Sequence, residues 1–308
     1  MILVTGAGGA AGVAVIRVLR ARNEPVVAVD ADPLAAGLAL ADDRAVVGFA
    51  RDESFVSDLC EAVKRFGADT VLCTVSEEML GLAGREAELV RAGAAIWLSP
   101  RDAIETCVDK WAFACALERA GITTPATAIG RDGAGIRGPW IVKPRFGRGS
   151  RDVYAVDARD DLEAVYRRVD DPIVQTRACG REFTVDVVID RDGVVRGAIP
   201  RWRLETKAGI STRGRTFADA AVIEAATSTV TALKLQAAVN VQGFEHDGRV
   251  SIIEVNPRVS GGLSLTQAAG ADVVGELVRG TRGEPVRADA LTFESGVTMR
   301  RYFMEVFS

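Results

Sequence analysis

Residues 239–262 decide the fold that the sequence predicts, and they read Val-Asn-Val-Gln-Gly-Phe-Glu-His-Asp-Gly-Arg-Val-Ser-Ile-Ile-Glu-Val-Asn-Pro-Arg-Val-Ser-Gly-Gly. Two runs rich in β-branched residues, 239–245 and 249–255, flank the tripeptide at 246–248. Glycine at position 248 supplies the positive φ that a tight turn needs. The pattern therefore predicts a β-hairpin with a three-residue loop.

The register of this hairpin determines which side chains share a face. A three-residue loop would place Glu245 opposite Arg249, and Gln242 opposite Ile252. Because side chains alternate between the two faces of a strand, residues two apart lie on the same side. We therefore expect one face to carry a polar cluster together with one isoleucine. Its members are Gln242, Ile252, Glu254 and Asn256.

The chemistry of this face points to a hard cation. Two amides and a carboxylate offer oxygen ligands of the kind that Mg²⁺ prefers, with water and phosphate oxygens completing an octahedron. Arg258 follows two residues after Asn256 and could neutralise charge on a transferring phosphoryl group. Taken without the surrounding sequence, the same residues would more often form a solvated polar face.

The segment Glu-Val-Asn-Pro-Arg-Val-Ser-Gly-Gly at 254–262 closely resembles the metal-binding segment of the ATP-grasp superfamily. The resemblance is greatest to the branch that contains the carbamoyl phosphate synthetase large subunit and biotin carboxylase. It implies that Gln242, Glu254 and Asn256 hold two magnesium ions, for which manganese could substitute, and that these ions bridge the phosphates of ATP. It also implies that Arg258 contacts the γ-phosphate or an acyl phosphate.

Composition limits the other possibilities. The chain has 308 residues, 48% of them hydrophobic, and a formal net charge of −4, so it can bury a large core and gives no general reason to expect nucleic acid. No apolar run reaches the roughly 18 residues that cross a bilayer, and no signal peptide is visible. Five scattered cysteines favour a reducing compartment, so we expect a cytoplasmic protein that does not bind membranes. A single histidine leaves little for His-dependent catalysis.

The N-terminus follows the order strand, glycine turn, helix, strand, acid. Residues 1–5 lead into the glycine-rich turn at 6–12, and the second strand ends at Asp30. This arrangement is typical of dinucleotide-binding domains and leaves an NAD(P)-dependent oxidoreductase open. None of the three tyrosines has a lysine four residues later, as short-chain dehydrogenases require. The turn can instead serve close helix–strand packing, and the resemblance implies a Rossmann-like domain over 1–100 that precedes the ATP-grasp module. Helices over 53–66 and 77–92 and strands over 68–73 and 95–98 complete a parallel, doubly wound unit.

The central part contains two motifs that favour phosphate binding. Asp109-Lys110 opens a helix, and in the resemblance such a lysine contacts ATP phosphate. A predicted strand then carries Lys143 into an apolar setting, where an unpaired ammonium would be costly. The loop after that strand combines glycines that free backbone N–H groups with basic side chains, and it resembles the family's lid over the triphosphate. Its candidate nucleotide-binding residues are Arg145, Gly147, Arg148, Gly149 and Ser150.

A linker between two predicted strands follows at 175–182. In the resemblance its backbone meets the adenine, so Gln175, Thr176 and Arg177 are candidates for nucleotide contacts. Glu182, after the glycine, would contact the ribose or the opposite wall of the cleft. Many ATP-grasp proteins have an acid where this chain has Thr176, which leaves the ribose contact at that position open.

Residues 200–215 form the most basic stretch of the chain. A tryptophan among the basic residues could indicate a nucleic-acid surface, but the patch is isolated in an acidic chain. A loop that supplies cations to the phosphate site is the favoured interpretation. The resemblance implies that basic residues of this stretch reach the γ-phosphate or the substrate carboxylate, which makes Arg201 and Lys207 candidate catalytic residues.

Together these motifs predict a Rossmann-like parallel sheet followed by an ATP-grasp fold of two α+β subdomains. The expected units span residues 1–100, 101–182 and 183–308. The implied activity is an ATP-dependent ligase that joins a small-molecule carboxylate to an amine through an acyl phosphate and releases ADP and phosphate. A nicotinamide oxidoreductase and a non-catalytic nucleotide-binding protein stay open as alternatives, as does assembly into a homodimer.

Overall fold

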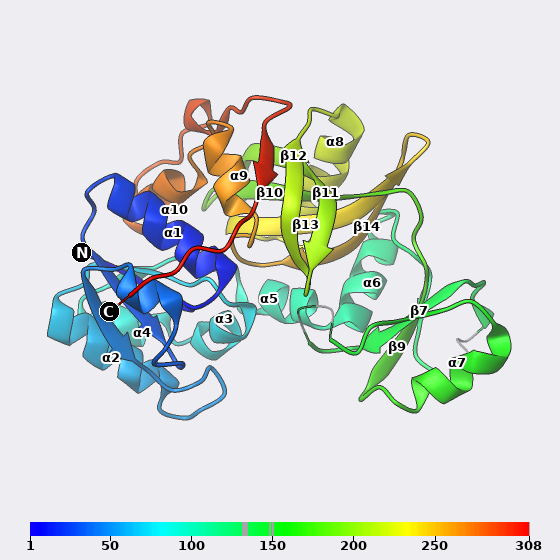
Figure 1. Cartoon of the computed structure of the whole chain (residues 1–308), viewed down its shortest axis with the longest axis horizontal. Coiled ribbons are helices and arrows are strands. Elements are labelled where there is room, and N and C mark those ends of the chain that lie inside the picture. Colours follow the sequence, from blue (N-terminus) through cyan, green and yellow to red (C-terminus); the bar gives the residue numbers. More distant parts are fainter. Residues whose placement is uncertain (131–134, 148, 150, 308) are drawn as a thin grey trace.

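The computed structural model describes residues 1–130, 135–147, 149 and 151–307, so two predicted loop residues, Arg148 and Ser150, lie outside the described residues. Three sheets organise the chain, and Figure 1 shows the N-terminal sheet in one lobe, the small second sheet in a lobe at the opposite end, and the third sheet above and between them. Within the described residues, no helix combines the length and apolar character needed to cross a membrane.

The first sheet has the strand order β3-β2-β1-β4-β5, and the pairs are parallel. Its strands are β1 (Ile2–Val4), β2 (Val26–Asp30), β3 (Asp43–Val46), β4 (Thr70–Leu72) and β5 (Ala95–Ile96). The helices around it are α1 (Ala10–Ala21), α2 (Phe55–Phe66), α3 (Ser76–Leu82) and α4 (Glu86–Ala92), with a 3₁₀ turn at Ala36–Ala39. The predicted doubly wound parallel sheet is therefore present, and β3 is a strand that the sequence pattern did not indicate.

The region predicted as one helix over 77–92 is two helices, α3 and α4. Ala83 at the end of α3 has an extended backbone, and Gly84 follows with a φ of +85°. A left-handed residue ends a helix because its backbone cannot continue the right-handed hydrogen-bond ladder. The apolar periodicity of the two helices concealed this break.

The N-terminal glycine turn brings α1 close to β1. A Cβ atom on Gly12 would lie 2.2 Å from the carbonyl oxygen of Gly6, so only glycine allows this approach. The acid at the end of β2 bonds to the same turn, because the Asp30 carboxylate accepts a 2.7 Å hydrogen bond from the backbone N–H of Gly8. These contacts give the turn a packing function whether or not it meets a ligand.

The second sheet is small and has the order β6-β9-β7-β8. Its strands are β6 (Thr127–Ala128), β7 (Trp140–Pro144), β8 (Tyr154–Val156) and β9 (Pro172–Thr176), and α7 (Arg159–Tyr166) packs on it. Helices α5 (Arg101–Val108) and α6 (Lys110–Arg119) connect it to the first sheet. The carboxylate of Asp109 caps α6 by accepting from the backbone N–H groups of Trp111 and Ala112.

The third sheet is antiparallel and has the order β14-β13-β10-β11-β12-β15. Its strands are β10 (Arg181–Ile189), β11 (Val195–Lys207), β12 (Ile210–Thr216), β13 (Ala237–His246), β14 (Arg249–Asn256) and β15 (Thr298–Arg300). Helix α8 (Ala220–Ala232) packs with α6 against the apolar face of this sheet. The opposite face carries the polar side chains of the site.

The last helices join the third sheet to the first. Helices α9 (Leu263–Ala268) and α10 (Val273–Thr281) lie beside α1 in Figure 1, and a 3₁₀ turn follows at Asp289–Leu291. Buried side chains from both ends of the chain, among them Ile2, Ile16, Val274 and Leu277, share one hydrophobic core. The N-terminal sheet is thus held against the C-terminal part of the chain, and this contact encloses one side of the site.

Candidate active site

The hairpin at 239–256 forms, but its register differs from the prediction. The turn has two residues rather than three, because His246 pairs with Arg249 and both Asp247 and Gly248 have positive φ, at 49° and 76°. The register then shifts between Gln242 and Gly243, where Ile253 is an extra residue on β14. The predicted pairing of Gln242 with Ile252 is wrong, since Gln242 faces Glu254.

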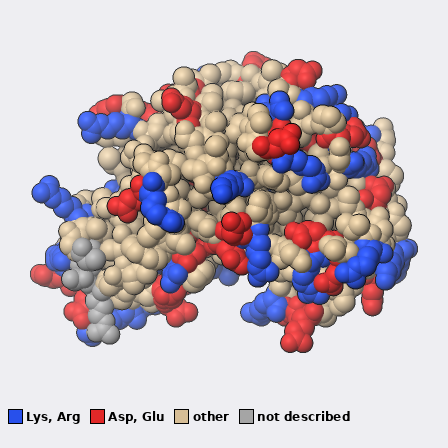
Figure 2. Space-filling view, turned by 180° about the vertical axis from the view of Figure 1, so that it is seen from behind, with Lys and Arg blue, Asp and Glu red and all other residues tan. Residues whose placement is uncertain are grey.

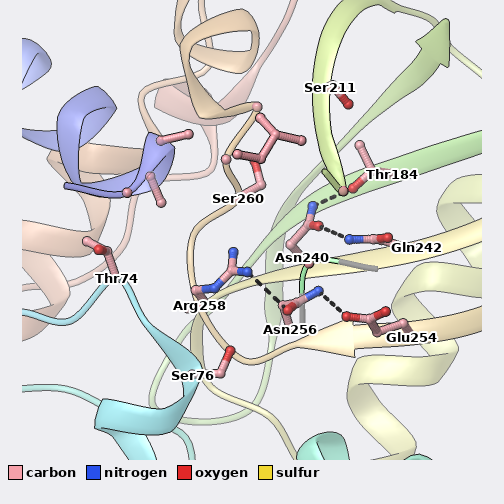
Figure 3. A pocket seen from close by; sticks show the side chains of 18 of the residues that line it. Thr74, Ser76, Thr184, Ser211, Asn240, Gln242, Glu254, Asn256, Arg258 and Ser260 are labelled. Atoms are coloured by element: carbon pink, nitrogen blue, oxygen red, sulfur yellow. Dashed lines mark hydrogen bonds between the residues drawn. The ribbon is translucent and has the colours of Figure 1, made fainter. Parts of the chain in front are cut away.

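The altered register places one predicted residue, Ile252, on the opposite face of the sheet and leaves the other predicted residues on the polar face. Ile252 pairs with Gly243 and is fully buried in the core on the opposite face. Gln242, Glu254 and Asn256 still share the polar face, where Asn240 joins them opposite Asn256. Figure 3 shows these four side chains side by side on neighbouring strands.

Hydrogen bonds join the four residues in two pairs, and in the first of them Gln242 donates to Asn240 Oδ1 over 3.3 Å. Asn256 donates to Glu254 Oε1 over 2.9 Å, and its own Oδ1 accepts from Arg258 over 3.1 Å. Gln242 Oε1 accepts from Arg203 over 2.6 Å. Within the described residues, Glu254 Oε2 accepts no hydrogen bond that the structure records. The donor set of two amides and one carboxylate fits Mg²⁺, and most of the compensating negative charge would have to come from phosphate.

Two cavities meet at this cluster. The first, about 450 Å³, lies between the second and third sheets and is named the nucleotide cavity after the predicted nucleotide-binding residues that line it. The second, about 270 Å³, lies between the third sheet, the N-terminus of α1 and the loop after β4, and is named the substrate cavity after the candidate catalytic residues that line it. Four residues line both cavities, namely Gly149, Arg203, Gln242 and Glu254. These four residues are referred to as the shared wall.

Most of the predicted site residues line one or both of the two cavities. Those lining the nucleotide cavity besides the shared wall are Lys110, Lys143, Gly147, Gln175, Arg177 and Glu182. Those lining the substrate cavity besides the shared wall are Arg201, Asn256 and Arg258. Three described candidates, Arg145, Thr176 and Lys207, line neither cavity.

Lys143 is the most deeply placed cation of the nucleotide cavity. Its side chain is 8% exposed, and its ammonium donates to Gln175 Oε1 over 2.9 Å. Burial lowers the pKa of Lys143 from 10.5 to about 8, although the negative charge of Glu254 opposes this shift. An anionic phosphate beside the ammonium would supply the missing countercharge.

The depressed pKa of Lys143 predicts a pH-dependent difference in stability. Below pH 8 the folded protein holds a poorly solvated ammonium, whereas the unfolded chain keeps its proton up to pH 10.5. The free energy of unfolding therefore rises between these values by about 3 kcal/mol through this one group. Lys143→Met lacks this gain. The difference in free energy of unfolding between wild type and Lys143→Met should therefore shift by about 3 kcal/mol in favour of wild type between pH 7 and pH 10.5. Denaturant titration of both proteins measures the difference, and a constant value would show that the ammonium keeps its ordinary pKa.

Lys110 and the glycine loop lie together at the edge of the nucleotide cavity. The Lys110 ammonium donates to the carbonyl oxygen of Gly147 over 2.9 Å, and burial lowers its pKa. The backbone of Gly147 has a φ of +135°, and Gly149 has a φ of +66°. Arg145 points elsewhere: its guanidinium pairs with both oxygens of Asp109, which ties the loop to the start of α6.

The three candidate residues at the end of β9 and after it differ in how they lie relative to the nucleotide cavity. Gln175 is 5% exposed and bridges Lys143 to the Thr127 hydroxyl. Arg177 lines the cavity while pairing with Asp157 over 2.7 Å. The hydroxyl of Thr176 donates to the carbonyl oxygen of Arg137, away from the cavity lining.

Arg203 is the residue that the sequence analysis missed. Its guanidinium donates to Glu182 Oε1 over 2.7 Å, to Gln242, and to the carbonyl oxygen of Gly209. It therefore connects Glu182, whose pKa is raised by burial, to the predicted metal ligands. Lys207, the sequence-based choice, is exposed at the end of β11 beyond two register shifts. Alternation from Arg201 would have marked Arg203 as its neighbour on the same face.

The tryptophan in the basic stretch is part of the core. Trp202 is 9% exposed, stacks on Phe217 with ring centroids 3.8 Å apart, and carries the Arg181 guanidinium 3.9 Å above its ring. The ring of Trp202 therefore packs against other residues of the protein. Figure 2 shows acidic and basic side chains interspersed on both sides of the hollow between the lobes.

Comparisons with known proteins concern the fold of the chain and the sequence of its C-terminal part. A family model described as "ATP-grasp in the biosynthetic pathway with Ter operon" matches residues 168–303. A comparison with curated protein sequences finds no significant match.

Solved structures resemble nearly the whole chain. A biotin carboxylase from Campylobacter jejuni, solved with β,γ-ATP, has a TM-score of 0.74 at 17% identity over 95% of this chain and 73% of its own. An L-amino acid ligase from Bacillus licheniformis has a TM-score of 0.73 at 18% identity over 94% and 75%. An N5-carboxyaminoimidazole synthetase from Staphylococcus aureus has a TM-score of 0.72 at 14% identity over 93% and 78%. The chain as a whole therefore shares the fold of these solved structures, and residues 168–303 match an ATP-grasp family model.

Proposed function

We propose that the protein is an ATP-dependent carboxylate–amine ligase. The observation that carries this proposal is the shared wall: Arg203, Gln242 and Glu254 line the nucleotide cavity and the substrate cavity at once. A group transferred from one cavity to the other would pass beside one carboxylate, one amide and one guanidinium. Transfer of a phosphoryl group needs this combination of metal ligands and positive charge.

On the nucleotide side, Lys143 and Lys110 are placed to meet phosphate oxygens, and Gly147 and Gly149 leave their backbone accessible. Gln242, Glu254 and Asn256 would hold magnesium. Bound magnesium would offset the charge that develops on the phosphoryl oxygens. Arg177 and Glu182 then line the part of the cavity left for the nucleoside.

On the substrate side, Arg258 and Arg203 orient the carboxylate toward the γ-phosphate. A carboxylate oxygen forms a bond to the γ-phosphorus while the bond to the bridging β–γ oxygen breaks, so that ADP leaves. The amine nitrogen then attacks the acyl carbon, phosphate leaves, and the nitrogen gives up a proton. Both steps proceed without a protein nucleophile, which suits a chain whose one histidine, His246, ends strand β13 beside the hairpin turn.

Two kinds of support come from similar proteins. The Bacillus licheniformis structure is of an L-amino acid ligase, and a biotin carboxylase domain from Hydrogenobacter thermophilus was solved with magnesium ADP and bicarbonate. These proteins share the fold at 15–18% identity, so the carboxylate and the amine must be found by experiment.

The test is a screen of carboxylates and amines with Mg-ATP in which ADP formation and product mass are read together. We expect ADP release that requires one carboxylate, is stimulated by one amine, and accompanies a product whose mass equals the sum of both less water. Binding of NADH without binding of ATP would instead support an oxidoreductase. Binding of ATP without turnover in a broad metabolite pool would support a nucleotide-binding protein.

A further inference from the structure

Arg201 is buried at the substrate cavity with part of its hydrogen-bonding capacity unused. Its side chain is 1% exposed, and its Nη2 donates to Asp186 over 2.9 Å and to the Ser260 hydroxyl over 2.7 Å. Its Nε is buried and has no hydrogen-bond partner among the described residues. A buried N–H without an acceptor is unfavourable, and since Nε is enclosed by protein, Nη1 is the donor left for a ligand, because no hydrogen bond from it to a described residue is recorded.

The loop after β14 is shaped to fit this guanidinium. A Cβ atom on Gly262 would lie 2.1 Å from Arg201 Nη1, so glycine is needed for Arg201 to occupy its position. Gly261 and Gly262 both line the substrate cavity. Nη1 therefore lies directly behind the lining of the cavity.

The N-terminus of α1 approaches the same loop. A Cβ atom on Gly261 would lie 3.5 Å from the Cβ of Ala10, and Gly9, Ala10 and Ala11 line the cavity. Gly9 is the N-cap of this 12-residue helix and offers no side-chain cap. Backbone N–H groups at such an end favour an anion.

Arginines outnumber carboxylates in the lining of the substrate cavity. Its charged residues among those described are Arg201, Arg203 and Arg258 against Glu77 and Glu254. Asp186 pairs with Arg201, and Arg301 lies close by, where it donates to the carbonyl oxygens of Ser211 and Gly261. The surplus of positive charge in the lining suits an anionic group.

This end is separate from the shared wall. Arg201 and Arg203 are two residues apart on β11, which places their backbones roughly 7 Å apart. Arg203 lines both cavities, whereas Arg201 lines the substrate cavity alone. A carboxylate positioned for attack beside Arg203 would leave the donors of Arg201 unused.

We propose that the carboxylate substrate carries a second anionic group, a carboxylate or a phosphate ester, which binds between Arg201 and the N-terminus of α1. This inference rests on the proposed function and narrows its substrate class to small dianions. The second group would hold one end of the substrate in place. The length of the substrate would then determine where the reacting carboxylate lies.

The test compares matched substrates that differ in one anionic group. The pairs are glutamate with norvaline, glutarate with valerate, and phosphoserine with serine. Wild-type protein with Mg-ATP and an amine pool should prefer a dianion in at least one pair by on the order of 10- to 100-fold in kcat/KM, mainly through KM. The pair with the largest ratio distinguishes carboxylate from phosphate.

Variants assign the preference to Arg201. Arg201→Gln alone would strand the charge of Asp186 in the core, so it is combined with Asp186→Asn, and the double variant is checked by thermal unfolding. We expect the ratio within the preferred pair to fall toward one. Ser260→Ala keeps both charges but removes one contact of Nη2, and it should lower the ratio less.

A second readout separates this inference from the proposed function. Calorimetry with glutamate, glutarate and phosphoserine in the presence of Mg-ADP should show binding of at least one of these dianions, and this binding should weaken at least tenfold in the double variant. If no carboxylate supports ADP formation but this binding is found, the proposed function fails and the anion site stands. Equal use of both members of every pair by wild type, or an equal loss for both in the double variant, would overturn the anion site.

Discussion

Glu254→Gln should reduce turnover by at least 1,000-fold while leaving the fold intact. Glu254 is the one carboxylate on the shared wall, and its neighbours there are the neutral amide of Gln242 and the cation of Arg203. Glutamine has nearly the same shape and keeps one oxygen for Asn256, but it removes the charge that would hold magnesium. Loss of metal affinity and of charge compensation in the transition state should therefore coincide.

Glu245→Gln is the matched control for this change. Glu245 lies on the same hairpin outside both cavities, and its Oε1 accepts a 2.9 Å hydrogen bond from the backbone of Gly248, which glutamine can also accept. ADP formation at saturating magnesium is the measurement, with thermal unfolding as the check on folding. Glu254→Gln activity within tenfold of wild type would contradict the metal assignment.

Arg203→Gln should lower kcat by about 100- to 1,000-fold, the second largest effect we expect. Arg203 supplies positive charge where a phosphoryl group would cross between the cavities, and it holds Glu182 and the predicted metal ligand Gln242 in place. Removing it also leaves the partly buried Glu182 without its cation, so the pKa of that carboxyl should rise further.

Two further variants test whether the loss of kcat depends on the position of Arg203 or follows from the removal of any positive charge nearby. Arg213→Gln removes a guanidinium from the neighbouring strand β12, where it pairs with Glu205 at the surface, and kcat should change little. Lys207→Gln tests the residue that the sequence favours, and we expect a smaller loss than for Arg203→Gln. Equal kcat values for Arg203→Gln and Arg213→Gln would remove Arg203 from the transfer step.

The hairpin shows why the sequence predicted the face correctly and the register wrongly. The turn is one residue shorter than predicted, which shifts every pair by one, and the bulge at Ile253 shifts the pairs beyond it once more. Two shifts restore the alternation, so Glu254 and Asn256 face Gln242 and Asn240 as a polar cluster. Between the turn and the bulge only one shift applies, and Ile252 therefore turns into the core.

By itself, the sequence determined the parallel N-terminal sheet, the polar face that carries Gln242, Glu254 and Asn256, and the place of Lys143 on its strand, because alternation, glycine turns and capping are local properties of the chain. The tertiary structure decided that Arg203, and not Lys207, lies between the cavities, since bulges in β11 and the approach of the small sheet set that position. It also decided that Arg201 is buried against Gly262 and α1. Such contacts join residues from opposite ends of the chain, and only close packing of the complete fold brings them together.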